Sequence, residues 1–216
     1  FHCDAAQALG KVPLDVEAMK IDLMSLSAHK IYGPKGIGAL YVRRARPRVR
    51  LVPQMSGGGQ EGGIRSGTLA PALCAGFGTA LRIAAREMAA ETARLAALME
   101  RFRERLLAAH PGIVVNGDLV HRYPGNLNLG FPGLDGERLL AELPELALSS
   151  GAACASATSG PSYVLEAIGR SPALARSSLR IGIGRFTTAE EMAFAAERII
   201  AAVSRLGGIR AAGTTA

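Results

Sequence analysis

The sequence predicts an α/β fold in which part of a large α/β domain is followed by a small α+β domain. Short apolar runs typical of strands alternate along the chain with helical patterns. One helical pattern, over residues 71–109, is long enough to form a spine between two domains. The 216 residues, 49% of them hydrophobic, suffice for one sizeable domain or two small ones.

The first elements are strand patterns that end in polar residues. The chain opens on a strand that ends at Asp4 and leads into a helix. A short helix over 14–19 and a buried strand over 21–27 follow. The apolar run 38–42 is expected to be the return arm of a hairpin through the glycine turn at 33–36.

The long helical pattern over 71–109 has one apolar face, made by residues at spacings of three and four or sums of such steps. We interpret this face as core packing and not as a binding site. It consists of Leu95, Leu98, Met99, Phe102 and Leu106.

The second half of the chain is expected to mix strands and helices. A capping box, with Thr187 as N-cap and Glu190 three residues on, starts a last helix that ends near Leu206. The other expected elements are strands over 113–115, 126–131 and 178–184 and a helix over 136–143.

The net charge of +7 does not indicate a nucleic-acid-binding protein. The arginines are scattered through helical patterns, and the densest basic cluster, over 43–50, has no aromatic residue for stacking on bases. We therefore expect no direct nucleic-acid binding, and an acidic protein partner fits a basic face better. No apolar run is long enough to span a bilayer, so no membrane partner is expected.

The three cysteines are odd in number and widely separated. No pair has metal-ligand spacing, so we expect neither a metal site nor a disulfide framework, and a reducing compartment follows. Cys74 has apolar neighbours and reads as a buried structural residue. Cys3 is expected to pack behind a cofactor, whereas Cys154 lies in a run of small residues that predicts an exposed loop.

Lys30 comes directly after the strand over 21–27, beside a serine, a histidine and a glycine turn. A lysine at such a strand end, removed from water, loses its proton more readily and attacks carbonyl groups. Asp4 stands at the end of the preceding strand. A carboxylate and a Schiff-base lysine are what pyridoxal 5′-phosphate needs, because the carboxylate keeps the pyridine nitrogen protonated. Ser27 and His29 suit the phosphate group, and Gln7 suits the phenolic oxygen.

With these residues in view, the chain resembles the cysteine desulfurases of the class V aminotransferase group, which are fold-type I pyridoxal-phosphate enzymes. The resemblance extends from residue 1 to about Leu206, and its motifs fall in the family's order and spacing. The matching segments are 4–7, 27–36, 57–59, 65–68, 149–154 and 178–180.

The resemblance implies that residues 1–88 are the C-terminal half of a cofactor-binding large domain with a mostly parallel sheet and helices. Residues 89–206 would form the small domain with the cysteine loop, and 207–216 a flexible tail. Because the first residues lie inside an expected strand, we expect the chain to be the C-terminal part of a longer protein, with weak activity alone.

The resemblance also implies the roles of individual residues. Cys154 would be the nucleophile that takes sulfur from L-cysteine as a persulfide, leaving L-alanine. Lys30 would hold the cofactor and move the substrate's α-proton. Arg180 would bind the substrate carboxylate, and Thr68 would reach the cofactor phosphate of the partner subunit in a homodimer.

The partners implied are an iron–sulfur scaffold protein or another sulfur acceptor such as a tRNA-thiolation carrier, in the cytoplasm. No resident metal is expected, although Cys154 could contact a cluster transiently during transfer. The sequence departs from the family pattern outside the core chemistry, which leaves the acceptor open. The departures are Gln60, Gly63, Ala152 and Ala155.

The sequence is also compatible with two other functions. One is a selenocysteine lyase or another class V aminotransferase, although Cys154 in its small-residue loop argues against an aminotransferase that needs no cysteine. The other is a non-catalytic docking or dimerisation fragment. The absorbance of the protein with added cofactor separates an enzyme from such a fragment.

Overall fold

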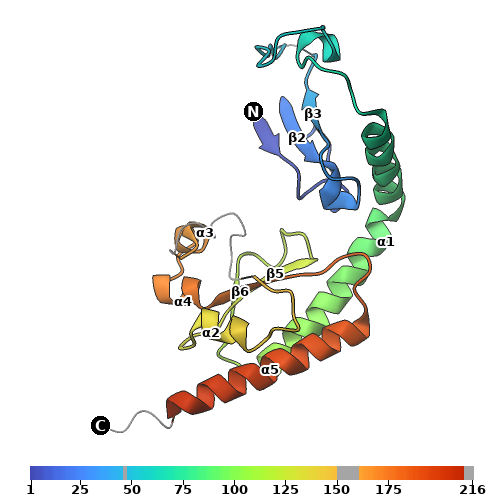
Figure 1. The fold of residues 1–216 in the computed structure, drawn as a ribbon. Coiled ribbons are helices and arrows are strands. Elements are labelled where there is room, and N and C mark those ends of the chain that lie inside the picture. The colour runs from blue at the N-terminus through green and yellow to red at the C-terminus, as the bar shows by residue number, and fades with distance from the viewer. Residues whose placement is uncertain (46–47, 150–160, 212–216) are drawn as a thin grey trace. The chain divides into compact units, whose positions relative to one another are not determined.

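The computed structural model describes residues 1–45, 48–149 and 161–211, with side chains described as far as residue 207. The chain divides into two compact units, Phe1–Ala90 and Glu91–Ala216, and each is described by itself. Each unit contains one three-stranded sheet (Figure 1).

The sheet of the first unit has the order β1-β2-β3. Strand β1 (His2–Asp4) runs parallel to β2 (Leu23–Ser27), and β2 is antiparallel to β3 (Gly38–Val42). The hairpin predicted between β2 and β3 is therefore confirmed. Of the two strand pairs described in this sheet, one is parallel and one antiparallel.

A 3-10 helix, η1 (Ala28–Ile31), follows β2 and packs on the first half of α1 (Pro71–Ala109). Ala28 and Ile31 are buried with Phe77 and Ala80 of α1. The chain leaves η1 through Gly33, where a Cβ atom would lie 2.9 Å from the Ala28 carbonyl oxygen and 3.2 Å from the Ala80 Cβ. Glycine thus lets the turn lie close against α1.

The helix predicted over 14–19 is wrong, because the chain makes a single turn there. The Asp15 carboxylate accepts hydrogen bonds from the backbone N–H groups of Glu17 and Ala18, at 2.9 and 3.0 Å. Lys20 then adopts a left-handed conformation with φ of 53°, which ends the turn before β2. The Asp15 bonds are those of a helix N-cap, so Lys20, and not Asp15, is what stops the helix.

The sheet of the second unit is antiparallel, with the order β4-β5-β6. Its strands are β4 (Val114–Asn116), β5 (Asn126–Gly130) and β6 (Ser178–Gly182). Alternate residues of β5 and β6 face a core formed with the second half of α1, α2 (Gly136–Ala141) and α5 (Ala189–Ala211). The apolar face predicted on α1 is confirmed. Its five buried residues are Leu95, Leu98, Met99, Phe102 and Leu106.

Two short helices that the sequence did not predict, α3 (Tyr163–Ala167) and α4 (Pro172–Arg176), lie between residue 161 and β6. Helix α4 begins at a cap in which the Ser171 hydroxyl accepts from the Leu174 N–H. Helix α5 continues to Ala211, beyond the end predicted near Leu206. Residues 212–216 lie outside the described residues.

The capping box before α5 is shifted by one residue from the prediction. The Thr188 N–H donates to the Glu191 carboxylate at 2.9 Å, and the Glu191 N–H donates to the Thr188 hydroxyl at 3.2 Å. Thr187 instead accepts from the Gly184 N–H at 3.1 Å, inside the preceding loop. Two consecutive threonines made the register ambiguous in the sequence.

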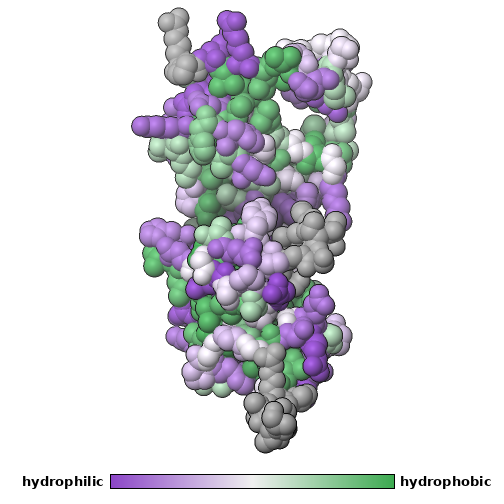
Figure 2. All heavy atoms as spheres, turned by 90° about the vertical axis from the view of Figure 1, so that its left-hand side faces the viewer, coloured by the Kyte–Doolittle hydropathy of each residue, from purple (hydrophilic) through white to green (hydrophobic). Residues whose placement is uncertain are grey.

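Hydrophobic and hydrophilic residues are interspersed on the face of the molecule that Figure 2 shows. Large apolar side chains at the surface include Leu40 of β3, which is 48% exposed, whereas Leu129 of β5 is 0% exposed. Leu40 lies on the outward face of the first sheet, because Met24 on the other face is buried with Ala5 and Ile21.

Candidate active site

The candidate site in the first unit lies at one edge of its sheet. Because β1 and β2 are parallel, with Asp4 opposite Ser25, their carboxyl ends lie at the same edge. Asp4 ends β1, and Ser27 ends β2 and leads into η1. Open α/β sheets bind ligands outside the carboxyl ends of their parallel strands, so this edge is the expected place for a ligand.

The local helix sets the direction of Lys30. Ala28 and Ile31 face α1 and are buried, so the two residues between them face outward. His29 and Lys30 are both exposed. The desolvation expected of Lys30 is therefore not found in the described structure, and its amine is accessible from solvent.

Short contacts organise the other side chains of this edge. The Ser27 hydroxyl and the His29 Nδ1 atom form a hydrogen bond of 2.9 Å. One oxygen of the Asp4 carboxylate accepts from the Ala6 N–H at 2.9 Å, and the Gln7 side-chain oxygen accepts from the Lys11 amine at 2.7 Å. These contacts are local, and in the described residues no hydrogen bond joins Asp4 or Gln7 to Ser27, His29 or Lys30.

The chemistry of this edge fits pyridoxal 5′-phosphate. Lys30 offers an accessible primary amine for the aldehyde, and Asp4 offers a carboxylate for the ring nitrogen. The hydroxyl of Ser27 and the imidazole of His29, already held together, are donors suited to a phosphate.

Thr68 lies apart from this edge, in the chain that links β3 to α1. It is exposed, and in the described residues no hydrogen bond joins it to Asp4 or Lys30. The loop before it folds on itself, since the Gln60 side chain accepts from the Gly67 N–H at 3.0 Å. A 3-10 turn, η2 (Glu61–Gly63), lies in the same loop.

In the second unit, Arg180 lies in the middle of β6 and is half-buried. Its neighbour on β5 is Asn128, and its backbone N–H donates to the Ser149 carbonyl at 2.8 Å. Cys154, the predicted nucleophile, lies outside the described residues. Ser149 is the last described residue before it.

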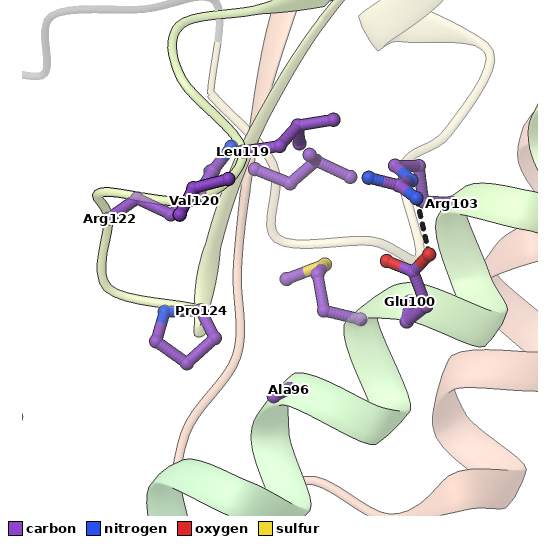
Figure 3. Close-up of a pocket in the computed structure, with 9 residues that line it drawn as sticks. Ala96, Glu100, Arg103, Leu119, Val120, Arg122 and Pro124 are labelled. Atoms are coloured by element: carbon purple, nitrogen blue, oxygen red, sulfur yellow. Dashed lines mark hydrogen bonds and ion pairs between the residues drawn. The ribbon is translucent and has the colours of Figure 1, made fainter.

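A cavity of about 280 Å³ lies elsewhere in the second unit, between α1 and the loop before β5 (Figure 3). Its charged residues are Glu100, Arg103 and Arg122, and Arg103 pairs with Glu100. Burial, and then the charge of Arg103, lower the pKa of Arg122. None of the predicted site residues lines this cavity.

Sequence reasoning missed a group of polar side chains beside Arg180, formed by Asn116, Asn128 and Ser178. Asn116 donates hydrogen bonds to the other two. The alternation of asparagine and leucine in the strand over 126–131 was the available signal, because it places the asparagines on the face away from the core.

The structure corrects the interpretation of one cysteine and adds two negative findings. Cys74 is exposed, because it lies in the first turn of α1, before the buried positions Phe77 and Ala80. In the part of the chain that the structure describes, no group of His, Cys, Asp and Glu side chains could hold a metal ion. Within the same residues, no helix is both long and apolar enough to cross a membrane.

Residues 1–193 match the family described as "Aminotransferase class-V", and the chain belongs to this family. It is 55% identical over 206 residues to the cysteine desulfurase of Homo sapiens, covering 95% of this chain and 45% of that protein. It is 57% identical over 206 residues to the cysteine desulfurase IscS of Neisseria gonorrhoeae, covering 95% of this chain and 50% of that protein. The chain thus spans about half the length of the curated relatives it matches.

Solved structures show the same fold. A NifS-like protein from Rickettsia africae superposes with a TM-score of 0.80 at 26% identity, covering 96% of this chain and 53% of that one. A second NifS-like protein gives a TM-score of 0.78 at 32% identity, covering 95% of this chain and 52% of the other. These likenesses confirm the predicted α/β class.

Proposed function

We propose that the chain is the part of a cysteine desulfurase that holds the cofactor lysine and the sulfur-accepting cysteine. The observation that carries the proposal is the 55% identity to a cysteine desulfurase over 206 residues. It is supported by Asp4 and Ser27, which end neighbouring parallel strands, and by Lys30 in the 3-10 helix that follows Ser27. The proposed boundaries are those expected above, with residues 1–88 in the cofactor-binding domain and 89–206 in the small domain.

Pyridoxal 5′-phosphate, when bound, supplies an electron-accepting ring that stabilises negative charge at the substrate's α-carbon. Lys30 would attach it and then move the α-proton. Asp4 would hold the ring nitrogen protonated, while Gln7 would bind the phenolic oxygen. Ser27 and His29 would bind the phosphate. Thr68 would reach the cofactor phosphate that is bound in the partner subunit.

In the second unit, Arg180 would bind the carboxylate of L-cysteine in a charge-assisted pair, which fixes the orientation of the substrate. The Cys154 thiolate would attack the substrate sulfur. A sulfur–sulfur bond forms, the carbon–sulfur bond breaks, and its electron pair stays with the substrate carbon, which takes a proton to give L-alanine. The persulfide on Cys154 then carries the sulfur.

The proposed partners are a second copy of the protein and an acceptor of sulfur. An iron–sulfur scaffold protein or a tRNA-thiolation carrier would take the persulfide sulfur. A cytoplasmic location is proposed because the three cysteines are odd in number and widely separated, which favours a reducing compartment. A related protein of Drosophila melanogaster is described as mitochondrial, which makes localisation by cell fractionation informative.

Absorbance and product assays test this function. With added pyridoxal 5′-phosphate, an enzyme gives the band of a lysine-bound cofactor, whereas a docking fragment gives only the spectrum of free cofactor. With L-cysteine, the desulfurase yields L-alanine and protein-bound sulfur in equal amounts. Cys154→Ser is expected to keep the cofactor band and release no sulfur. Sulfur release by this variant at the wild-type rate would contradict the assignment.

A further inference from the structure

Three residues form a polar row across the sheet of the second unit. Asn116 of β4 is paired with Asn128 of β5, and Asn128 is paired with Arg180 of β6. Residues paired across neighbouring strands point to the same face of a sheet. On β5 the flanking residues Leu127 and Leu129 are buried in the core, so the polar row occupies the opposite face.

A chain of hydrogen bonds fixes which way the asparagine amides point. The Ser178 hydroxyl donates to the Leu174 carbonyl at 2.7 Å, which commits its only hydrogen. It can then only accept from Asn116, whose Nδ2 atom lies 3.0 Å away. The same Nδ2 atom donates to the Asn128 Oδ1 atom at 2.7 Å. Asn116 and Ser178 are 4% and 0% exposed, so water does not compete for these bonds.

The amide of Asn128 is therefore oriented by its buried neighbours. Its oxygen accepts from the Asn116 amide, so its Nδ2 group is directed away from Asn116. Because β5 is the middle strand, Asn128 is paired with Asn116 of β4 on one side and with Arg180 of β6 on the other. Within the described residues, no hydrogen bond occupies the Asn128 Nδ2 group or the Arg180 guanidinium.

Among the described residues, this arrangement leaves one buried hydrogen-bond acceptor unpaired, which is unfavourable for folding. The Oδ1 atom of Asn116 is buried and has no hydrogen-bond partner within the described part of the chain. A buried unpaired acceptor is unfavourable, and such groups in native proteins call for an explanation. Holding the Asn128 amide in one orientation is such an explanation.

We propose that Asn128 binds the carboxylate of the substrate together with Arg180, and that Asn116 and Ser178 are positioning residues for it. The proposal rests on the proposed function for the identity of the substrate, an α-amino acid. Paired residues on neighbouring strands have Cβ atoms about 5 Å apart, so a guanidinium and an amide there can each reach one oxygen of a carboxylate. Arg180 supplies the charge, and Asn128 supplies a second, directional donor.

The test is a titration of the full chain, labelled with 15N, with L-alanine and with ethylamine. Ethylamine is L-alanine without its carboxylate, so the pair isolates carboxylate recognition. The expected result is that the side-chain amide signal of Asn128 shifts saturably with L-alanine and does not shift with ethylamine. Equal shifts with both compounds, or no shift with either, would overturn the proposal.

A matched pair of variants separates binding from a general charge effect. Asn128→Asp removes the two donors without changing size, and Asn126→Asp makes the same change at an exposed position on the same face of β5. Asn128→Asp should raise the Kd for L-alanine about tenfold or more, as expected for losing one hydrogen bond to a charged group. Asn126→Asp should change it less than about twofold. Equal effects of the two variants would contradict the assignment.

The positioning role of Asn116 has its own readout. Asn116→Leu leaves Asn128 present but frees its amide, so discrimination between L-alanine and ethylamine should fall while the 15N spectrum stays that of a folded chain. Unchanged discrimination in the folded variant, or in Asn116→Ser if the leucine variant does not fold, would show that Asn116 plays no part. L-alanine binding needs no turnover, so binding by a chain that gives neither a lysine-bound cofactor band nor sulfur release would count against the proposed function and leave the carboxylate site standing.

Discussion

The two sheets of the molecule position their polar residues by different means. In the first unit, the sheet is exposed at Leu40, and Asp4 and Ser27 lie at the same edge because two parallel strands end there. In the second unit, a packed core holds one face of the sheet, and buried hydrogen bonds orient Asn128 on the other. Parallel strands bring residues to one edge, whereas the buried hydrogen bonds from Asn116 also fix the direction of the Asn128 amide.

This contrast bears on how each unit would perform its part of the chemistry. An exposed lysine at a strand end is free to exchange partners, which suits a residue that must attach a cofactor and later move a proton. A carboxylate-binding pair gains from being rigid, because less conformational entropy is lost when the ligand binds. The predictions that follow test the contrast.

Replacing Lys30 should have the largest effect. Lys30→Ala removes the amine that would attach the cofactor, so L-alanine production from L-cysteine should fall about 10³-fold or more. Lys35→Ala, an exposed lysine in the nearby turn, is the matched control and should retain most of the activity. Comparable losses in the two variants would mean that the position of Lys30 at the strand end has no special role.

Replacing one leucine in each sheet by alanine should lower the free energy of unfolding by different amounts. Leu129→Ala, at a position that is 0% exposed, should lower the free energy of unfolding by about 2–5 kcal/mol. Leu40→Ala, at a position on β3 that is 48% exposed, should cost less than about 1 kcal/mol. Urea unfolding followed by circular dichroism measures both. A larger loss for Leu40→Ala would contradict the exposed position described for Leu40 on the first sheet.

Arg94 should stabilise the loop that follows β6 through its hydrogen bonds to backbone carbonyls. Its guanidinium donates to three backbone carbonyls, those of Gly184, Arg185 and Thr187, at 3.2, 2.6 and 2.7 Å. Arg94→Met keeps the apolar stem but leaves these carbonyls without the donor, and should lower the free energy of unfolding by about 1–3 kcal/mol. Arg82→Met, at another site on α1, serves as a control and should cost less than about 0.5 kcal/mol.

The smallest effect concerns pH. Hydrogen bonds from the His121 side chain and from the Val120 and His121 N–H groups lower the pKa of Asp118 below its usual value of 3.8. A carboxyl with a lowered pKa contributes stability above its unfolded pKa and loses it as the pH falls through the folded pKa. The turn at Asp118 should therefore loosen only below about pH 4, and Asp118→Asn should remove this dependence. Amide exchange of Val120 measures it.

Local pattern predicted much of the fold. The β2–β3 hairpin and the buried face of α1 followed from periodicity, which reports directly on what an element buries. The helix over 14–19 failed because Lys20 adopts a left-handed conformation, which ends the chain's helical course after a single turn. The cap before α5 was misplaced by one residue because both Thr187 and Thr188 can accept a backbone hydrogen bond.

The candidate site was predicted unevenly. Residues at strand ends, such as Asp4 and Lys30, could be recognised because the end of a strand is visible in the sequence. The role inferred for Asn128 could not, because it depends on strand register and on a hydrogen bond from Asn116, which lies in another strand. Local composition predicts neither the register of the strands nor the orientation of a side-chain amide.

The most direct test of the central claim is to locate the cofactor on the chain. The protein is incubated with pyridoxal 5′-phosphate, the covalent link is reduced with borohydride, and the labelled peptide is identified by mass spectrometry. The account predicts a label on Lys30, at the shared carboxyl edge of β1 and β2. A label on Lys11 or Lys35 instead would contradict the assignment of this edge as the cofactor site.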